Sequence, residues 1–167
     1  MRNSKLVLLL QKMPVKELQQ LRELVHCGYF NQHESLKRLC NYLLGLAPKF
    51  DEAALERPFV YAQAEPGEPY NEDRLNNLNS DLLQLVYKFL TIEGLDKRSD
   101  WQGQLLMQEL LDRDVPKHLR HQARRQMQIL QRRKDRSVDY YETSYQLHAQ
   151  LDRFELSQQN RRFSEHL

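Results

Sequence analysis

The chain has 167 residues, of which 40% are hydrophobic and 29% are charged, and its formal net charge is +2. This balance is typical of a folded globular domain and excludes a disordered chain. Five glycines and six prolines are too few for a turn-rich all-β protein, and the abundant Leu, Gln, Arg and Glu favour helices. We therefore expect an all-α protein of about seven or eight helices, packed as antiparallel hairpins in a bundle.

The first predicted element is a short helix over Ser4–Lys12, which Pro14 ends. Its apolar run, Leu6–Leu10, has five residues, against about 20 in a membrane-spanning helix. Gln11 and Lys12 end that run, and no small-residue cleavage site follows, so it is also a poor secretory signal. We expect a cytoplasmic protein with no membrane partner.

Three further short segments complete the first third of the chain. A helix is predicted over Pro14–Val25, with Gly28 as its C-terminal cap. The next helix has an apolar stripe and ends near Gly45. Asp51 is expected to cap a short helix over Glu52–Glu56, and Pro58 to disturb whatever follows. The stripe of the middle helix consists of Leu36, Leu39, Cys40, Leu43 and Leu44.

The clearest element is PYNEDRLNNLNSDLLQLVYKFL, which predicts a long helix over Asn71–Glu93. Asn71 is a favourable N-cap, and acidic residues follow it at the positive end of the helix dipole. We expect this helix to be the central packing element and Gly94 to end it. Its net charge of −2 argues against a DNA-recognition helix. Its apolar stripe consists of Leu75, Leu78, Leu82, Leu85, Val86 and Phe89.

Two segments, GYFNQHESLKRLCNYL (residues 28–43) and PGEPYNEDRLNNLNSDLLQLVYKFL (residues 66–90), resemble a family of uncharacterised bacterial helical proteins. In that family a PYFN turn is followed by a PGxxYN turn and a long leucine-rich helix. The resemblance implies an all-helical fold that often continues into hairpins similar to tetratricopeptide repeats. It implies no known activity.

Residues 96–167 predict three helices, over about Asp100–Arg113, Pro116–Asp135 and Ser137 to at least Leu156. The short loops between them favour antiparallel hairpins. We interpret residues 1–95 as an N-terminal helical layer and residues 96–167 as C-terminal hairpins, together forming one continuous structural unit. The expected apolar side of the first of these three helices consists of Trp101, Leu105, Leu106, Leu110 and Leu111.

The helix from Pro116 carries the strongest charge pattern. Residues 117–136 contain eight Lys and Arg against one acidic residue, Asp135, which gives a net charge of +7. At 100° per residue, Leu119, Ala123, Met127 and Leu130 share one face. The opposite face carries Lys117, Arg120, His121, Arg124, Arg125 and Arg132. The favoured interpretation is a face that is solvated or paired with Asp112, Asp114, Asp139 and Glu142. The alternatives are an electrostatic footprint for nucleic acid, for an acidic partner or for a membrane surface.

The last predicted helix is rich in tyrosine. Tyr140, Tyr141 and Tyr145 are candidate recognition residues, because tyrosine is favoured at protein interfaces. Alternatively, the rings form the wet edge of a helical core, with each hydroxyl in water. No glycine follows Gly103 and the chain ends in RRFSEHL, which leaves open that the sequence is the start of a helical-repeat array.

Signatures of metal and catalytic sites are missing. His26, Cys27, His33 and Cys40 are zinc-compatible residue types without the paired spacing of structural zinc sites, and a buried free thiol is favoured for Cys40. Two histidines one turn apart in HLRH (residues 118–121) lack a matching carboxylate or thiol pair. Phosphate-binding glycine loops, nucleophile elbows and calcium loops are absent. We expect no metal, no cofactor and no catalytic residue, and a small enzyme with a site assembled from distant residues stays an alternative.

The functional interpretation is a non-enzymatic protein–protein interaction module, either a scaffold or an adaptor. The expected partner is another protein, or a second copy of the chain bound through helical surfaces. The alternative is a nucleic-acid-binding or transcription-associated protein that uses the basic helix, residues 117–136. The candidate partner-binding residues are Arg120, Arg124, Arg125, Arg132, Tyr140, Tyr141 and Tyr145.

Overall fold

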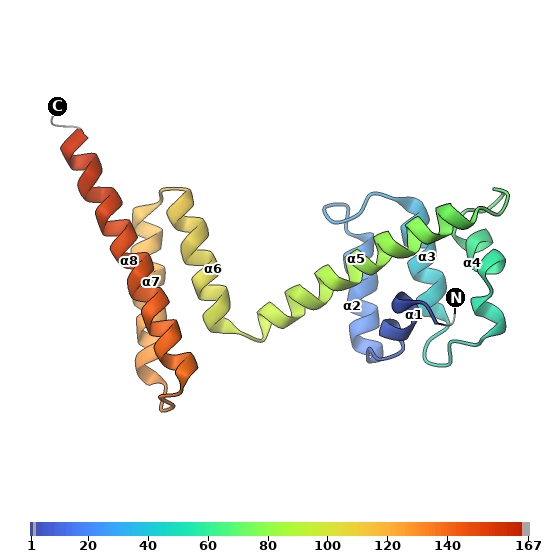
Figure 1. Ribbon diagram of the computed structural model, residues 1–167, viewed down its shortest axis with the longest axis horizontal. Helices are drawn as coiled ribbons and strands as arrows, with labels where there is room; N and C mark the ends of the chain where they lie inside the picture. The colour runs from blue at the N-terminus through green and yellow to red at the C-terminus, as the bar shows by residue number, and fades with distance from the viewer. Residues whose placement is uncertain (2, 165–167) are drawn as a thin grey trace. The chain divides into compact units, whose positions relative to one another are not determined.

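The computed structural model describes residue 1 and residues 3–164, with the side chains of residue 1 and residues 3–156. In this described part the chain forms eight α-helices and one short 3₁₀ helix, and no strand, so the predicted all-α fold is confirmed (Figure 1). The chain divides into two compact units, an N-terminal unit of residues 1–93 and a C-terminal unit of residues 94–167. No described helix is both long enough and apolar enough to cross a membrane.

The N-terminal unit consists of short helices and one long helix that runs across them (Figure 1). Buried apolar side chains from all of these helices, most of them leucines, join in one hydrophobic cluster, which includes the whole predicted stripe of the long helix. The predicted stripe of the 34–45 helix is buried in the same cluster. The elements are α1 (Lys5–Leu10), α2 (Val15–His26), α3 (Glu34–Gly45), η1 (Ala53–Leu55), α4 (Arg57–Ala64) and α5 (Glu72–Asp96), which extends three residues beyond the unit.

The N-terminal end of α5 agrees with the sequence prediction, whereas its C-terminal end differs from it. The Asn71 Oδ1 atom accepts a hydrogen bond from the Arg74 N–H at 2.9 Å, which confirms Asn71 as a cap. The prediction that Gly94 ends the helix is wrong, because the helix continues to Asp96. A glycine inside a helix costs only about 1 kcal/mol relative to alanine, and the flanking residues tolerate that cost.

The structure also corrects the predicted role of Gly28. Gly28 does not cap α2, because the cap residue is Cys27, which has extended backbone angles. The turn is closed instead by the buried Asn31 side chain, whose Nδ2 donates to the Val25 carbonyl at 2.9 Å. Asn31 Oδ1 also accepts from the His33 N–H at 3.0 Å. The hydrogen-bonded side chain of Asn31 therefore stabilises the turn that the sequence analysis attributed to a glycine cap.

The segment around Pro58 also differs from its prediction. Asp51 caps no α-helix, and the expected helix over 52–56 is the single 3₁₀ turn η1. Pro58 lies in the first turn of α4, a helix that the sequence analysis missed. The first backbone N–H groups of a helix have no intrahelical acceptor, so a proline there costs no hydrogen bond.

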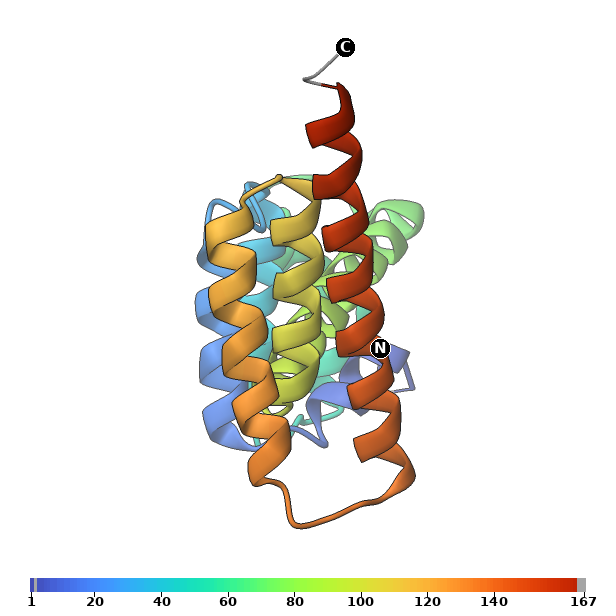
Figure 2. The same cartoon turned by 90° about the vertical axis from the view of Figure 1, so that its left-hand side faces the viewer.

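The C-terminal unit is a bundle of three helices in which each helix packs against the other two (Figure 2). Its helices are α6 (Ser99–Asp112), α7 (Pro116–Arg132) and α8 (Val138–Ser164). The chain end at residues 165–167 lies outside the described residues. Among the described side chains the core is small, consisting of Met107, Leu119, Ala123, Leu130, Leu147 and Phe154.

The predicted core face of α6 is wrong in its first half. Trp101 and Leu105 are 57% and 54% exposed, and Leu106 is exposed as well. The buried residues of α6 are Gly103 and Met107, and the predicted Leu110 and Leu111 pack half-buried against the same core. A Cβ atom on Gly103 would lie 2.0 Å from Nε2 of Gln126, so the missing side chain makes room for a buried glutamine of α7. Close approach of two helices, rather than apolar periodicity, selects this face.

Candidate partner-binding surface

The two faces of α7 are separated as its sequence predicts. Leu119, Ala123 and Leu130 are buried, and Met127 packs half-buried against the same cluster. Gln126 is buried on this face too, which the sequence analysis did not foresee. Its place could have been inferred only from Gly103, whose lack of a side chain leaves space for it.

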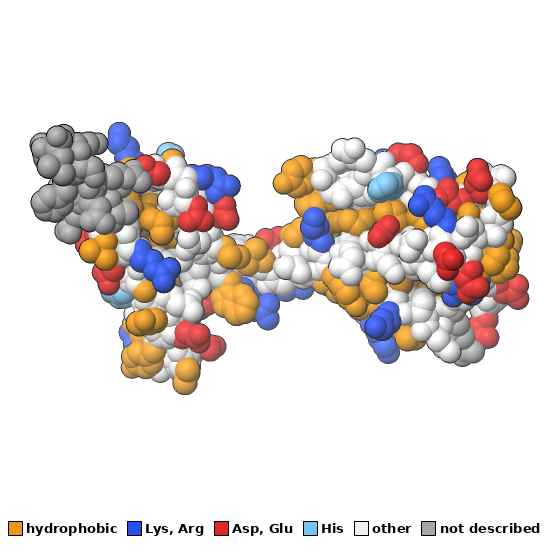
Figure 3. Space-filling model, turned by 45° about the horizontal axis from the view of Figure 1, so that its top comes forward, with side chains coloured by type: hydrophobic (Ala, Val, Ile, Leu, Met, Phe, Trp, Pro, Cys, Tyr) orange, Lys and Arg blue, Asp and Glu red, His pale blue; other side chains and the backbone are white. Residues whose placement is uncertain are grey.

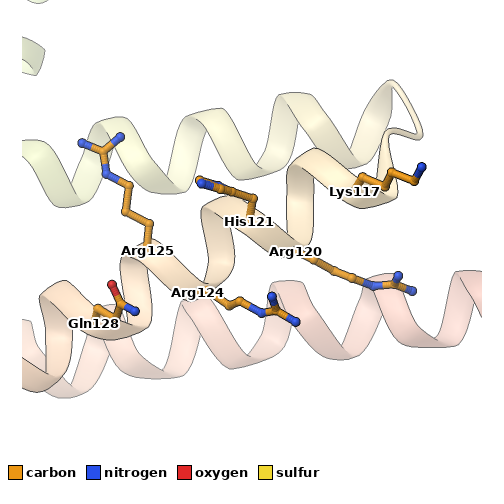
Figure 4. Close-up of a pocket in the computed structure, with 6 residues that line it drawn as sticks. All are labelled: Lys117, Arg120, His121, Arg124, Arg125 and Gln128. Carbon is orange, nitrogen blue, oxygen red and sulfur yellow. The ribbon is translucent and has the colours of Figure 1, made fainter.

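The exposed face of α7 carries a row of six polar side chains, which we call the α7 cation stripe. Its members recur at intervals of three and four residues, so they lie one above another along the helix. They line an open hollow of about 520 Å³ (Figure 4). None of these lining side chains is apolar. The stripe consists of Lys117, Arg120, His121, Arg124, Arg125 and Gln128.

The long side chains of the stripe spread to both sides of α7. Figure 4 shows His121 and Arg125 extending toward α6, and Arg120 and Arg124 extending toward α8. The Arg120 guanidinium lies 5.5 Å from the ring centroid of Phe154 on α8, a cation–π contact that holds it over the edge of the core. The stripe is therefore a shallow positive trough about as wide as one helix.

The positive charge of the stripe is not neutralised by the described ion pairs. In the C-terminal unit these pairs join Arg113 to Glu109 and Arg133 to Asp100, the latter at 2.9 Å. In the part of the chain that the structure describes, no ion pair involves a stripe residue or the exposed Arg132. α7 as a whole carries five Lys and Arg and no Asp or Glu, so its cations repel one another in the free chain.

The three candidate tyrosines lie in two different environments. Tyr140 packs half-buried against the small core, and the Arg136 guanidinium lies 4.1 Å from its ring centroid. Tyr141 and Tyr145 are 62% and 75% exposed, on the same face of α8 as the exposed Val138. The sequence grouped the three residues, and the structure leaves only two of them available to a partner.

Away from the α7 cation stripe, the largest pKa shift is caused by burial in the core. Burial raises the pKa of the Cys40 thiol to about 12, whereas Cys27 is exposed. The His26 Nε2 atom lies 3.1 Å from Asn41 Oδ1 rather than beside a thiol. Among the described residues, no group of three or more His, Cys, Asp or Glu side chains is placed to hold a metal ion.

The C-terminal unit exposes a set of apolar side chains on α6 and α8, of which the sequence analysis had singled out only the tyrosines for recognition. Apolar residues occur on more than one face of α6, so periodicity alone assigned Trp101, Leu105 and Leu106 to the core. Exposed side chains of this kind, when they gather, mark interaction surfaces. They are Trp101, Leu105, Leu106, Val138, Tyr141, Tyr145 and Leu156.

Comparison with protein-family models, with curated proteins and with solved structures gives no match. The resemblance to bacterial helical proteins therefore stays a prediction. The function has to be argued from the surfaces of this chain, of which the α7 cation stripe is the most sharply defined.

Proposed function

We propose that this chain is a non-enzymatic protein–protein interaction module that binds an acidic segment of its partner on the α7 cation stripe. One observation carries the proposal: in the described part of the chain, none of the stripe's Lys and Arg side chains has a carboxylate within ion-pair distance. Exposed cations on one 17-residue helix produce a local positive potential that attracts an anionic partner.

The surroundings of the stripe favour a protein over a nucleic acid. Nucleic acids are wide and densely charged, and the helices on either side of α7 carry the exposed carboxylates of Asp112 and Asp152. The stripe contains no Phe, Tyr or Trp side chain on which a base could stack. An acidic peptide segment is narrow enough to contact α7 alone. The exposed Trp101 and Tyr145 in the same unit are residue types enriched in protein interfaces.

The hollow over the stripe supports binding rather than catalysis. Sites for small molecules are usually enclosed and mainly apolar, with a few polar groups. This hollow is open, and the six side chains that line it include no carboxylate or thiol that could act with His121. Long, flexible cations without such partners are suited to an extended anionic surface.

A charge-reversal experiment tests the proposal. The variant Arg120→Glu/Arg124→Glu/Arg125→Glu reverses the stripe, and Lys5→Glu/Lys12→Glu/Lys16→Glu makes the same change in net charge on exposed lysines of the N-terminal unit. The probes are a fluorescent peptide of Glu and Ala and a DNA oligonucleotide of equal charge, followed by anisotropy at about 50 and 200 mM salt. We expect the peptide to bind the wild-type chain and the lysine variant, and to lose at least tenfold in affinity for the stripe variant.

Two results would overturn the proposal. If the DNA binds more tightly than the peptide and its affinity falls by orders of magnitude with salt, the stripe is a nucleic-acid surface. If neither probe distinguishes the stripe variant from the lysine variant, the stripe is a solvated face without a partner.

A further inference from the structure

We infer that the acidic segment bound by the α7 cation stripe is supplied by a second copy of this chain, through residues 68–73, EPYNED. This inference rests on the function proposed above and names its partner. It follows from a second charge pattern in the N-terminal unit that is opposite to that of α7.

The complementary charge lies between Asp51 and Asp73. Residues 51–73 contain seven Asp and Glu and a single cation, Arg57, so their net charge is −6. Asp and Glu side chains gather over α4 and the start of α5 in Figure 3. One chain therefore carries an acidic surface in its N-terminal unit and a basic helix in its C-terminal unit. Two copies can satisfy both charges by pairing head to tail.

Ion pairs within the unit decide which of these carboxylates are available. Glu65 is held by Arg74 at 3.0 Å and faces Arg38 as well, and Glu72 lies 3.3 Å from Arg57. The exposed Glu68 and Asp73 take part in none of the described ion pairs. Asp51 and Glu56 are exposed and outside these ion pairs as well, and Glu68 and Asp73 are the two available carboxylates that flank the turn leading into α5.

This turn is held in one conformation before it binds anything. Gly67 has φ +86°, a left-handed angle that glycine adopts without strain. The Tyr70 ring packs edge-on against the Tyr61 ring, with centroids 5.6 Å apart, and Asn71 is fixed by its hydrogen bond to Arg74. Preorganisation lowers the entropy that the segment loses on binding.

Tyr70 gives the turn an aromatic side chain that suits the hollow on α7. It is 44% exposed and lies between the two available carboxylates in sequence. Guanidinium groups stack on aromatic rings, and the aliphatic stems of arginine offer apolar contact. From Lys117 to Arg125 the stripe extends about 12 Å along α7, which accommodates a six-residue turn with a carboxylate near each end.

Head-to-tail contact makes two identical interfaces if two copies close on each other, and longer assemblies if they do not. Because the contact is mainly between exposed charges, it weakens as salt shortens the screening length. Self-association should therefore depend on both protein concentration and ionic strength.

Complementary charge-reversed chains provide the test. The stripe variant is Arg120→Glu/Arg124→Glu/Arg125→Glu, and the turn variant is Glu68→Lys/Asp73→Lys. Light scattering after size exclusion, over roughly micromolar to 0.1 mM protein, gives the mass. Circular dichroism checks that each variant is folded. We expect the wild-type chain to dimerise at low salt, each variant alone to be monomeric, and an equimolar mixture of the two variants to recover the dimer.

The failures of the inference and of the proposed function are distinguishable. A monomeric wild-type chain that still binds the Glu and Ala peptide overturns the inference and leaves the proposed function in place. A dimer that the stripe variant also forms overturns the inference, and assigns the contact to the exposed apolar residues of α6 and α8. If the wild-type chain neither binds the peptide nor self-associates, both the inference and the proposed function are overturned.

Discussion

The two units of this chain differ in how many of their apolar side chains are buried in a shared core. In the N-terminal unit, 23 buried hydrophobic side chains from every helix form one cluster. In the C-terminal unit, six described side chains are buried in the core, while leucines, tyrosines and the single tryptophan stay exposed. Burial of apolar area is the main favourable contribution to folding, so the first unit is expected to be the more stable.

This difference suggests a division of roles. A unit with a large shared core is suited to act as a scaffold, and this one also presents exposed apolar side chains such as Tyr29, Phe59 and Tyr70. A unit that leaves apolar and cationic side chains on its surface is suited to contact something else. The predictions below test this contrast, and the Trp101 fluorescence reports on the C-terminal unit while circular dichroism follows both.

The largest effect is expected from the core of the N-terminal unit. Leu39 is fully buried, so Leu39→Ala should lower the free energy of unfolding by about 2–5 kcal/mol through lost burial and a residual cavity. The same change at the exposed Leu105 of α6 should cost less than about 0.5 kcal/mol. Urea denaturation followed by circular dichroism measures both, and similar losses for the two would contradict the contrast between units.

The turn between α2 and α3 should be the next most sensitive point. Asn31→Asp keeps the shape of the side chain and removes the N–H group that donates to the Val25 carbonyl. It also places a charge on a residue that is buried. We expect a loss of about 1–3 kcal/mol in the free energy of unfolding near pH 7. Gln32→Glu, one residue away and exposed, is the matched control, and equal effects of the two changes would refute the role given to Asn31.

A pH titration separates the units by chemistry. Because burial raises the pKa of Cys40 to about 12, the folded chain retains the thiol proton at a pH where the unfolded chain, with a pKa of about 8.5, loses it. This contribution to stability is complete below about pH 8.5 and is lost as the pH rises toward 12. By pH 10 the loss should be on the order of 1–2 kcal/mol.

Replacement of the thiol identifies its contribution. Cys40→Ala should lower stability at neutral pH and flatten its fall between about pH 8.5 and pH 10. Burial also raises the pKa of Tyr42, which leaves a smaller slope of the same sign. In the folded chain only the exposed Cys27 should react quickly with a thiol reagent, and rapid modification of Cys40 would contradict its burial.

The smallest effect concerns the contact of α6 with α7. Gly103→Ala gains helix propensity but displaces the buried Gln126 side chain, and these two effects oppose each other. In a Gln126→Ala background the displacement is absent, so the same change should stabilise the chain by about 1 kcal/mol. A double-mutant cycle, read by Trp101 fluorescence in urea, should give a coupling of about 1 kcal/mol. Additive effects would mean that the two residues do not share space.

The sequence alone predicted those elements whose local signals agree with one another. On α5, the Asn71 cap, the acidic first turn and one apolar stripe all indicate the same helix. On α7, cations and apolar residues alternate with a single period, so both faces were correctly assigned. Local propensity and burial favour the same structure in these places.

Tertiary structure decided the outcome wherever a local sequence signal is compatible with two structures. A proline suits the first turn of a helix as well as a loop, so the role of Pro58 depends on where α4 begins. Gly94 can end a helix or continue it at a small cost. On α6, the close approach of Gln126 to Gly103 turned Trp101 and Leu105 outward, because the packing of two helices depends on the space between their backbones as well as on hydrophobicity.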